Sequence, residues 1–134
     1  MKVGDIMTNH VHTIHLDDKL ELIQDILADV DYHHLLVEDD GKLVGIISDR
    51  DVLRHQSPFL GTEHERDVDR ALLNRDAGSI MTPHPITVEA GTSLDEAAKL
   101  LLKHTISCLP VVAFDQSIEG IITWKDLLRN QSIE

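Results

Sequence analysis

The sequence predicts a mixed α/β (α+β) fold in which one β-α-β-β-α unit occurs twice. The first observation is a repeated segment, because Asp5–Thr8 (DIMT) recurs 74 residues later as Ser79–Thr82 (SIMT). The second is that Gly45–Ser48 (GIIS) recurs 75 residues later as Gly120–Thr123 (GIIT). A nearly constant offset over most of the chain indicates a duplicated unit with one inserted residue.

The first half of each unit is predicted to be a strand followed by a helix. The strand covers residues 12–16 in the first copy and 86–89 in the second. A helix follows because apolar residues recur three and four positions apart, which places them on one face. These residues are Leu20, Ile23, Ile26, Leu27 and Val30, and in the second copy Leu94, Ala97, Ala98, Leu101 and Leu102.

The second half is predicted to be two strands followed by a short helix, which starts after Ser48 or Thr123. A tight turn is expected at Asp39-Asp40-Gly41, because glycine tolerates a positive φ. The inserted residue falls in the matching turn of the second copy, 114–117. The strands are residues 35–37 and 43–47, and in the second copy 109–112 and 118–122.

We expect the two copies, residues 1–55 and 77–134, to form one intertwined module. A unit of about 55 residues buries too little apolar surface to be stable alone, so the copies are predicted to pack sheet to sheet with pseudo-twofold symmetry. Such packing leaves clefts between the sheets, where small ligands commonly bind. The linker, residues 56–76, is predicted to hold a helix around 65–73. The linker residues expected to face the module or a partner are Val68, Ala71 and Leu72.

The composition excludes several classes of protein. With 134 residues, 42% hydrophobic and 27% charged, the chain is globular rather than disordered or fibrous. A net charge of −12 argues against nucleic acid as a partner, and no apolar run approaches the roughly 20 residues of a membrane span. The chain begins without the apolar core of an export signal, and its single cysteine, Cys108, suits a reducing compartment. We therefore expect a cytoplasmic protein with no membrane partner.

The main candidate for chemistry is a tetrapeptide at the end of the last strand of each copy, Ser48–Asp51 (SDRD) and Thr123–Asp126 (TWKD). Each places a hydroxyl at the strand end and a carboxylate three residues later. This is also the capping-box pattern, so a purely structural role is an alternative. A sugar phosphate is favoured because an ionised carboxylate can accept both hydroxyls of a ribose cis-diol, and because a helix N-terminus suits phosphate. Arg50 and Lys125 add a cation inside each motif.

These motifs resemble those of a tandem CBS domain pair, also called a Bateman module. The resemblance rests on DIMT at 5–8, GIISDRD at 45–51, LPVV at 109–112 and GIITWKD at 120–126, and it covers nearly the whole chain apart from the linker. It implies a stand-alone regulatory protein that binds an adenosyl ligand (AMP, ADP, ATP, NAD or S-adenosylmethionine) in the clefts between the repeats. It also implies a homodimer of modules and an effector protein that receives the signal. No further cofactor is required, and the nucleotide binds with or without Mg.

The resemblance also assigns residues to the ligand. Those for ribose and phosphate are Ser48 and Asp51 in one cleft, and Thr123 and Asp126 in the other. The cations of the two motifs, Arg50 and Lys125, join them as candidates on the residue argument above. Residues beside the first strand, and residues just before the second strand, face the adenine. The former are His12, Thr13, Ile86 and Thr87, and the latter are His33, His34, Ser107 and Cys108.

The sequence departs from the family pattern just before the second strand of each copy. Relatives that bind nucleotides often carry a basic residue there to contact phosphate, whereas this chain has Asp31 and Thr105. The departure argues against a triphosphate and leaves Arg50, Lys125 and His33 to balance the phosphate charge. The cleft that Asp31 faces is therefore the weaker candidate.

Two alternatives stay open from the sequence. One is a dimerisation scaffold whose clefts are degenerate, which the missing cations favour. The other is a metal-dependent hydrolase built on His10, His12 and His15, although on a strand His15 points away from the other two. The chain has no phosphate-loop, dinucleotide-binding, zinc-protease or nucleophile-elbow motif. We therefore expect no metal site and no catalytic residue.

Overall fold

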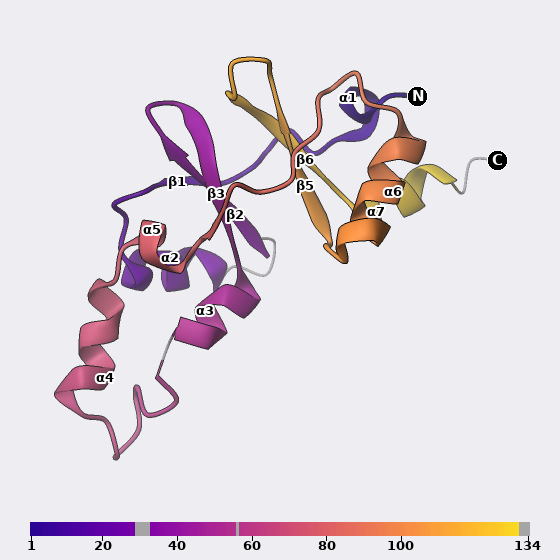
Figure 1. Ribbon diagram of the computed structural model, residues 1–134. Helices are drawn as coiled ribbons and strands as arrows, with labels where there is room; N and C mark the ends of the chain where they lie inside the picture. Colours follow the sequence, from indigo (N-terminus) through magenta and orange to yellow (C-terminus); the bar gives the residue numbers. More distant parts are fainter. Residues whose placement is uncertain (29–32, 56, 132–134) are drawn as a thin grey trace. The chain divides into compact units, whose positions relative to one another are not determined.

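The computed structural model describes residues 1–28, 33–55 and 57–131, and it has the mixed α+β architecture that the sequence predicts (Figure 1). In chain order the elements are α1 (Val3–Ile6), β1 (Thr13–His15), α2 (Leu20–Leu27), β2 (His34–Asp39), β3 (Lys42–Ser48), α3 (Asp49–His55), α4 (Asp67–Ala71), the 3-10 turn η1 (Leu72–Asn74), α5 (Ala77–Ile80), β4 (Thr82–Pro83), α6 (Leu94–His104), β5 (Cys108–Val112), β6 (Ile118–Thr123) and α7 (Trp124–Gln131).

The chain divides into two compact units. The first-repeat unit holds residues 12–39 and 44–84, and the second-repeat unit holds 1–11, 40–43 and 85–134. The segment that opens each repeat therefore packs with the body of the other repeat, and neither repeat is complete without its counterpart.

Each unit has its own apolar core, and the two cores correspond at the repeat offset. In the first-repeat unit the buried cluster comprises Ile14, Leu20, Ile23, Leu35, Val37, Ile47, Val52, Leu73, Ala77 and Ile80. In the second-repeat unit it comprises Val3, Val88, Ala97, Leu101, Leu109, Val111, Ile122 and Leu127. The core positions follow the predicted periodicity, because the apolar stripe of each helix and the inward-facing residues of each strand are the ones buried.

The first-repeat unit is built on a four-stranded sheet with the order β1-β2-β3-β4. Strand β1 runs parallel to β2 with Thr13 opposite Leu36, and β4 lies antiparallel to β3. The tight turn predicted between β2 and β3 is confirmed, since Asp40 and Gly41 have φ values of 54° and 78°. The helix predicted from Leu20 to Leu27 is also confirmed, whereas Val30 lies outside the described residues.

The second-repeat unit contains the antiparallel hairpin β5–β6 with Cys108 opposite Thr123. The strand predicted at 86–89 is wrong: only Val88 pairs, through an isolated parallel bridge to Val111. The extended segment ends there because a turn follows, in which the Thr92 N–H donates to the Glu89 carbonyl at 3.0 Å.

Two other sequence expectations need correction. Leu102 was expected on the buried face of α6 but is 69% exposed. The buried stripe is centred on Ala97 and Leu101, and the next residue turns about 100° away from it. In the linker, the predicted helix breaks into α4 and η1, and the residue that enters the core is Leu73, which was not expected to do so. Val68 is 62% exposed, so its predicted contact with a partner stays a prediction.

The opening segment of each repeat docks on a glycine of the other repeat's last strand. Thr8 exchanges two backbone hydrogen bonds with Ile121, at 2.8 and 3.0 Å, and the equivalent Thr82 pairs with Ile46. A Cβ at Gly120 would lie 2.6 Å from the Thr8 carbonyl oxygen, and one at Gly45 would overlap the Met81 side chain. Only glycine admits so close an approach, which explains why both copies have glycine at this position of the strand.

Replacing Gly120 by alanine is expected to lower the free energy of unfolding by about 1–3 kcal/mol, because the new methyl group meets a fixed carbonyl. Gly91→Ala is the control, since a Cβ there has nothing within 4 Å, and its effect is expected to stay within about 0.5 kcal/mol. Urea unfolding followed by circular dichroism measures both. Equal stability of the two variants would contradict the close contact.

Candidate functional site

The strand-end motif of the first-repeat unit forms a closed set of hydrogen bonds. Asp51 Oδ2 accepts from the Ser48 backbone N–H at 2.9 Å and from the Ser48 hydroxyl at 3.1 Å. The Ser48 Oγ in turn accepts from the Asp51 N–H at 3.2 Å. The capping box that the sequence offered as the structural alternative is therefore present, and it fixes the carboxylate at the strand end.

The motif of the second-repeat unit repeats these contacts. Asp126 Oδ2 accepts from the Thr123 N–H at 3.0 Å and from its hydroxyl at 3.2 Å, and Thr123 Oγ1 accepts from the Asp126 N–H at 3.4 Å. One contact is added, because the Thr8 hydroxyl donates to Asp126 Oδ1 at 3.2 Å. The capping hydrogen bonds are therefore the same in both units, but only Asp126 accepts a further side-chain hydrogen bond at Oδ1.

A cation that the sequence reasoning missed accompanies each carboxylate. Arg54 Nη1 lies 4.0 Å from Asp51 Oδ1, and Arg129 Nη1 lies 4.0 Å from Asp126 Oδ1. Both arginines follow their aspartate by three residues on a helix, a spacing that places side chains on one face and could have indicated them. The predicted cations Arg50 and Lys125 are exposed, and no ion pair within 4.0 Å of either is found among the described residues.

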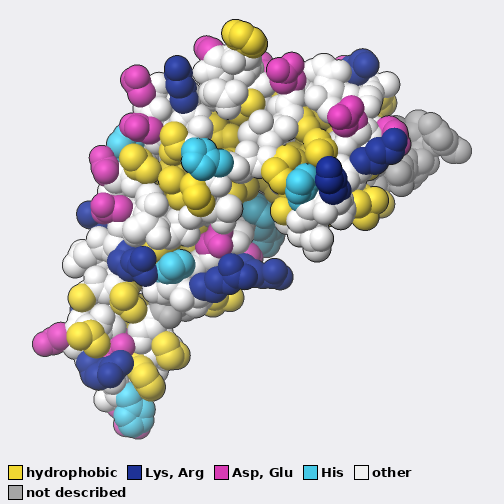
Figure 2. Space-filling view, viewed as in Figure 1, with side chains coloured by type: hydrophobic (Ala, Val, Ile, Leu, Met, Phe, Trp, Pro, Cys, Tyr) yellow, Lys and Arg dark blue, Asp and Glu magenta, His cyan; other side chains and the backbone are white. Residues whose placement is uncertain are grey.

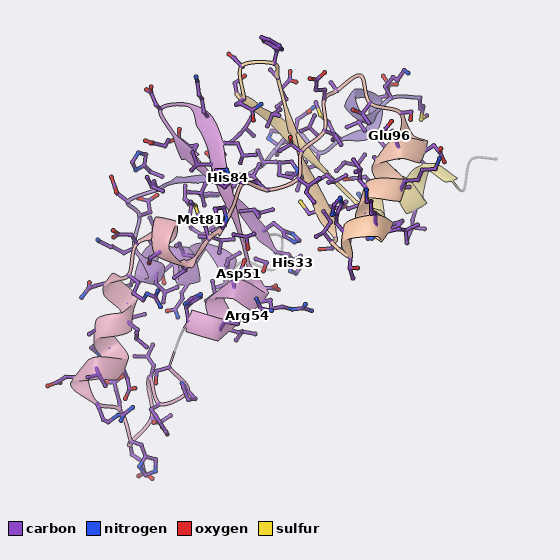
Figure 3. The ribbon with its side chains drawn as sticks, in the orientation of Figure 1. His33, Asp51, Arg54, Met81, His84 and Glu96 are labelled. Carbon is purple, nitrogen blue, oxygen red and sulfur yellow. The ribbon has the colours of Figure 1, made fainter. Side chains whose placement is uncertain are left out.

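The first-repeat unit brings His33 and the start of α3 together (Figure 3). The Asp49 N–H donates to the His33 carbonyl at 3.2 Å, and His33 Nδ1 lies 3.6 Å from Asp49 Oδ2. His12 lies beside β2, because its carbonyl oxygen accepts a hydrogen bond from the Leu36 N–H at 3.2 Å. Thr13 is exposed on β1. The residues expected around the adenine in this unit therefore lie on, or directly before, the adjacent parallel strands β1 and β2.

In the second-repeat unit the expected adenine-facing residues are placed differently. Cys108 is buried directly across the hairpin from Thr123, and burial, helped by the nearby Asp126 charge, raises the pKa of its thiol to about 12. Ser107 is exposed, and Ile86 and Thr87 are half-buried just before the Val88 bridge. Cys108 therefore contributes shape rather than a charge or a nucleophile.

The histidine cluster considered for metal does not assemble. His15 faces carboxylates of its own unit, at 3.5 Å from Asp17 and 3.5 Å from Asp39. Within residues 1–28, 33–55 and 57–131, no group of three histidine, cysteine, aspartate or glutamate side chains is close enough to hold a metal ion.

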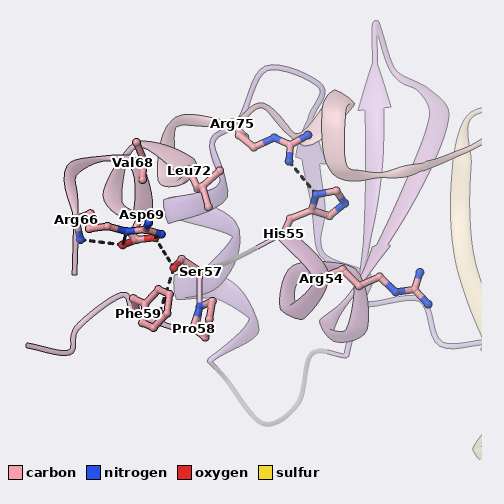
Figure 4. Close-up of a pocket in the computed structure, with 10 residues that line it drawn as sticks. All are labelled: Arg54, His55, Ser57, Pro58, Phe59, Arg66, Val68, Asp69, Leu72 and Arg75. Carbon is pink, nitrogen blue, oxygen red and sulfur yellow. Dashed lines mark hydrogen bonds and ion pairs between the residues drawn. The ribbon is translucent and has the colours of Figure 1, made fainter. Parts of the chain in front are cut away.

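A hollow of about 460 Å³ lies on the first-repeat unit, between α3 and the linker (Figure 4). Lys and Arg side chains gather over this part of the surface beside apolar ones (Figure 2). Its wall is held by Asp69, which accepts from the Ser57 hydroxyl at 2.7 Å and from the Arg66 guanidinium at 3.1 Å. These donors hold the pKa of the Asp69 carboxyl well below its usual value, so the clamp is an ion pair at neutral pH. The residues that line the hollow are Arg54, His55, Ser57, Pro58, Phe59, Arg66, Val68, Asp69, Leu72 and Arg75.

The fold is a doubled α+β unit that carries one hydroxyl–carboxylate cap at the end of the last strand of each copy. The chain belongs to the CBS domain family, which matches residues 3–58 and 77–132, and it is a tandem CBS domain pair. The resemblance drawn from the motifs is thereby confirmed.

Relatives of this chain include both small CBS proteins and a larger enzyme. A CBS domain-containing protein of Dictyostelium discoideum is 36% identical over 128 residues, which cover 94% of this chain and 88% of that protein. Inosine-5′-monophosphate dehydrogenase of Nitrosopumilus maritimus is 34% identical over 128 residues, which cover 95% of this chain but only 24% of the enzyme.

Two solved structures with bound adenosyl ligands share the fold. CBSX2 of Arabidopsis thaliana in complex with AMP has a TM-score of 0.81 and 29% identity, covering 98% of this chain and 96% of that one. The CBS domain pair of protein MJ0100, in complex with 5′-methylthioadenosine and S-adenosyl-L-methionine, has a TM-score of 0.79 and 28% identity, with coverage of 98% and 96%. In the described part of this chain, every helix is too short or too polar to cross a membrane.

The stability of the protein is expected to depend on pH through His34. Its pKa is lowered from 6.5, chiefly because burial disfavours the imidazolium and also because His33 is near, while Asp49 and Asp51 oppose the shift. The unfolded chain therefore binds a proton more readily than the folded one. The stability due to neutral His34 is full above about pH 6.5 and is lost as the pH falls through the lower folded-state value.

Replacing His34 by glutamine removes this contribution. Urea unfolding is expected to show a smaller loss of stability between about pH 7.5 and pH 5 than in the wild type. His64→Gln is the matched control, since His64 is 73% exposed, and it is expected to keep the wild-type dependence. An unchanged slope in His34→Gln would contradict the role of the buried imidazole.

Proposed function

We propose that this CBS pair is a regulatory protein that binds an adenosyl ligand, with the strand-end carboxylates holding the ribose. The observation that carries the proposal is that both carboxylates are largely buried and held in one orientation. The Asp51 side chain is 14% exposed and the Asp126 side chain 6%, and each is held in one orientation by its own cap. A fixed, largely desolvated carboxylate is a strong acceptor for the two hydroxyls of a ribose.

We expect the remaining contacts to come from residues around each carboxylate. In the first-repeat unit, Ser48 and Asp51 take the ribose, Arg50 and Arg54 balance the phosphate charge, and the adenine meets the strand edges at His12, Thr13, His33 and His34. In the second-repeat unit, Thr123 and Asp126 take the ribose, with Lys125 and Arg129 as cations. The adenine there meets Ile86, Thr87, Ser107 and Cys108.

A ligand with one phosphate fits this set better than a triphosphate. Each cap offers two nearby arginine or lysine side chains in a chain whose net charge is −12. The complexes of CBSX2 with AMP and of MJ0100 with 5′-methylthioadenosine and S-adenosylmethionine support a small adenosyl ligand. AMP is therefore the first ligand to test, with Mg as an optional companion only for longer phosphate chains.

The regulatory output requires a second protein. Ligand binding favours one arrangement of the module by its differential affinity, and a homodimer of modules then presents that arrangement to an effector protein in the cytoplasm. The protein has no catalysis of its own in this proposal. Exposed apolar side chains on the helices, Leu53, Val68 and Leu128, are candidate contacts for the dimer partner or the effector.

A scaffold without a ligand is the second candidate function. It is favoured by one specific observation, namely that the capping hydrogen bonds give both carboxylates a structural role without any ligand. A scaffold would still dimerise but would respond to no nucleotide.

Thermal-shift titrations separate the two functions. AMP is expected to raise the melting temperature, and Asp51→Asn and Asp126→Asn are each expected to weaken AMP binding at their own site by about tenfold or more. ADP, ATP, NAD and S-adenosylmethionine complete the set of ligands.

The control for these variants is Asp95→Asn, an exposed carboxylate paired with Lys99 on α6 at 3.1 Å, which is expected to respond as the wild type does. If no ligand raises the melting temperature of the wild-type protein, the scaffold is the correct function.

A further inference from the structure

The two strand-end carboxylates differ in how many acceptor positions they have left. An ionised carboxylate offers about four lone-pair positions, two on each oxygen. At Asp51 the Ser48 N–H and hydroxyl use two positions on Oδ2. At Asp126 the Thr123 N–H and hydroxyl use the same two positions, and the Thr8 hydroxyl uses a third, on Oδ1. Asp51 therefore retains two positions and Asp126 one.

The difference does not come from the helix cations. Arg54 and Arg129 lie at the same distance, 4.0 Å, from the Oδ1 of their aspartates. At that distance neither guanidinium makes a hydrogen bond to the carboxylate. The two ion pairs have the same length, so they do not change the number of free acceptor positions at either site. Among the hydrogen bonds to the two carboxylates, the one from the Thr8 hydroxyl is the difference.

The backbone holds Thr8 in place for this contact. Its N–H and carbonyl both hydrogen-bond to Ile121 on β6, two residues before the capping residue Thr123. Thr82 has the corresponding place beside Ile46 on β3. Among the described residues, which include both Thr82 and Asp51, the Thr82 hydroxyl makes no hydrogen bond to Asp51.

A ribose cis-diol donates two hydrogen bonds, so the free acceptors decide how well each site receives it. Asp51 can accept both hydroxyls and keep its cap intact. Asp126 can accept both only if the Thr8 hydroxyl gives up its bond and finds another acceptor. One displaced hydrogen bond costs about five- to tenfold in affinity.

We propose that Thr8 sets the affinity of the second-repeat site, and that the two ribose sites are therefore unequal, with the Asp51 site the tighter. This inference rests on the proposed function, since it concerns the ribose of the same adenosyl ligand. The sequence expectation that the cleft facing Asp31 is the weaker one is a competing prediction, and Asp31 lies outside the described residues.

The test is isothermal titration with AMP of the wild type, Thr8→Val and Thr82→Val. The wild type is expected to show two classes of site, and Thr8→Val to strengthen the weaker class about five- to tenfold, because valine frees Asp126 Oδ1. Thr82→Val is the matched control, since it removes the equivalent hydroxyl of the other repeat, and it is expected to titrate as the wild type does. Thr8→Ser keeps the hydroxyl and is expected to restore the wild-type curve.

Asp51→Asn assigns the classes, because it is expected to remove the tight one. Two equal sites in the wild type, or the same change in Thr82→Val as in Thr8→Val, would overturn the inference and leave the proposed function standing. Absence of AMP binding to the wild type would overturn the proposed function and the inference together.

Discussion

The structure depends on one local interaction, the hydrogen bond from a strand-end N–H to a carboxylate three residues further along. At Ser48 and Asp51, and again at Thr123 and Asp126, this bond ends a strand, begins a helix and satisfies a donor that would otherwise be left unpaired. The same bond immobilises the carboxylate. A group that the fold needs for capping is thereby oriented for binding, and the two roles are not alternatives.

A second constraint ties the caps to the rest of the chain. Gly45 and Gly120 precede the caps on their strands, and each admits the opening segment of the other repeat to van der Waals contact. That segment completes the core of the unit on which it docks, with Ala77 in one core and Val3 in the other. Through Thr8 it also reaches the carboxylate itself. The exchange of segments thus links the assembly of the fold to the chemistry of the site.

Much of this could be predicted because the signals are local and doubled. The repeat offset, the helical stripes and the Asp40-Gly41 turn each depend on a few neighbouring residues. The contacts that sequence reasoning missed are long-range. Thr8 and Asp126 are 118 positions apart, and nothing in either motif alone indicates their hydrogen bond. The strand expected at 86–89 failed for a local reason, since a turn over residues 89–92 follows Val88 directly.

The account stands on the claim that the strand-end carboxylates accept the ribose hydroxyls. Isothermal titration of the wild type and of Asp51→Asn with AMP and with 2′-deoxy-AMP tests this directly. The account predicts that the wild type prefers AMP by about tenfold at its tighter site, and that the preference at this site is lost in Asp51→Asn. Equal affinity of the wild type for the two nucleotides would contradict it.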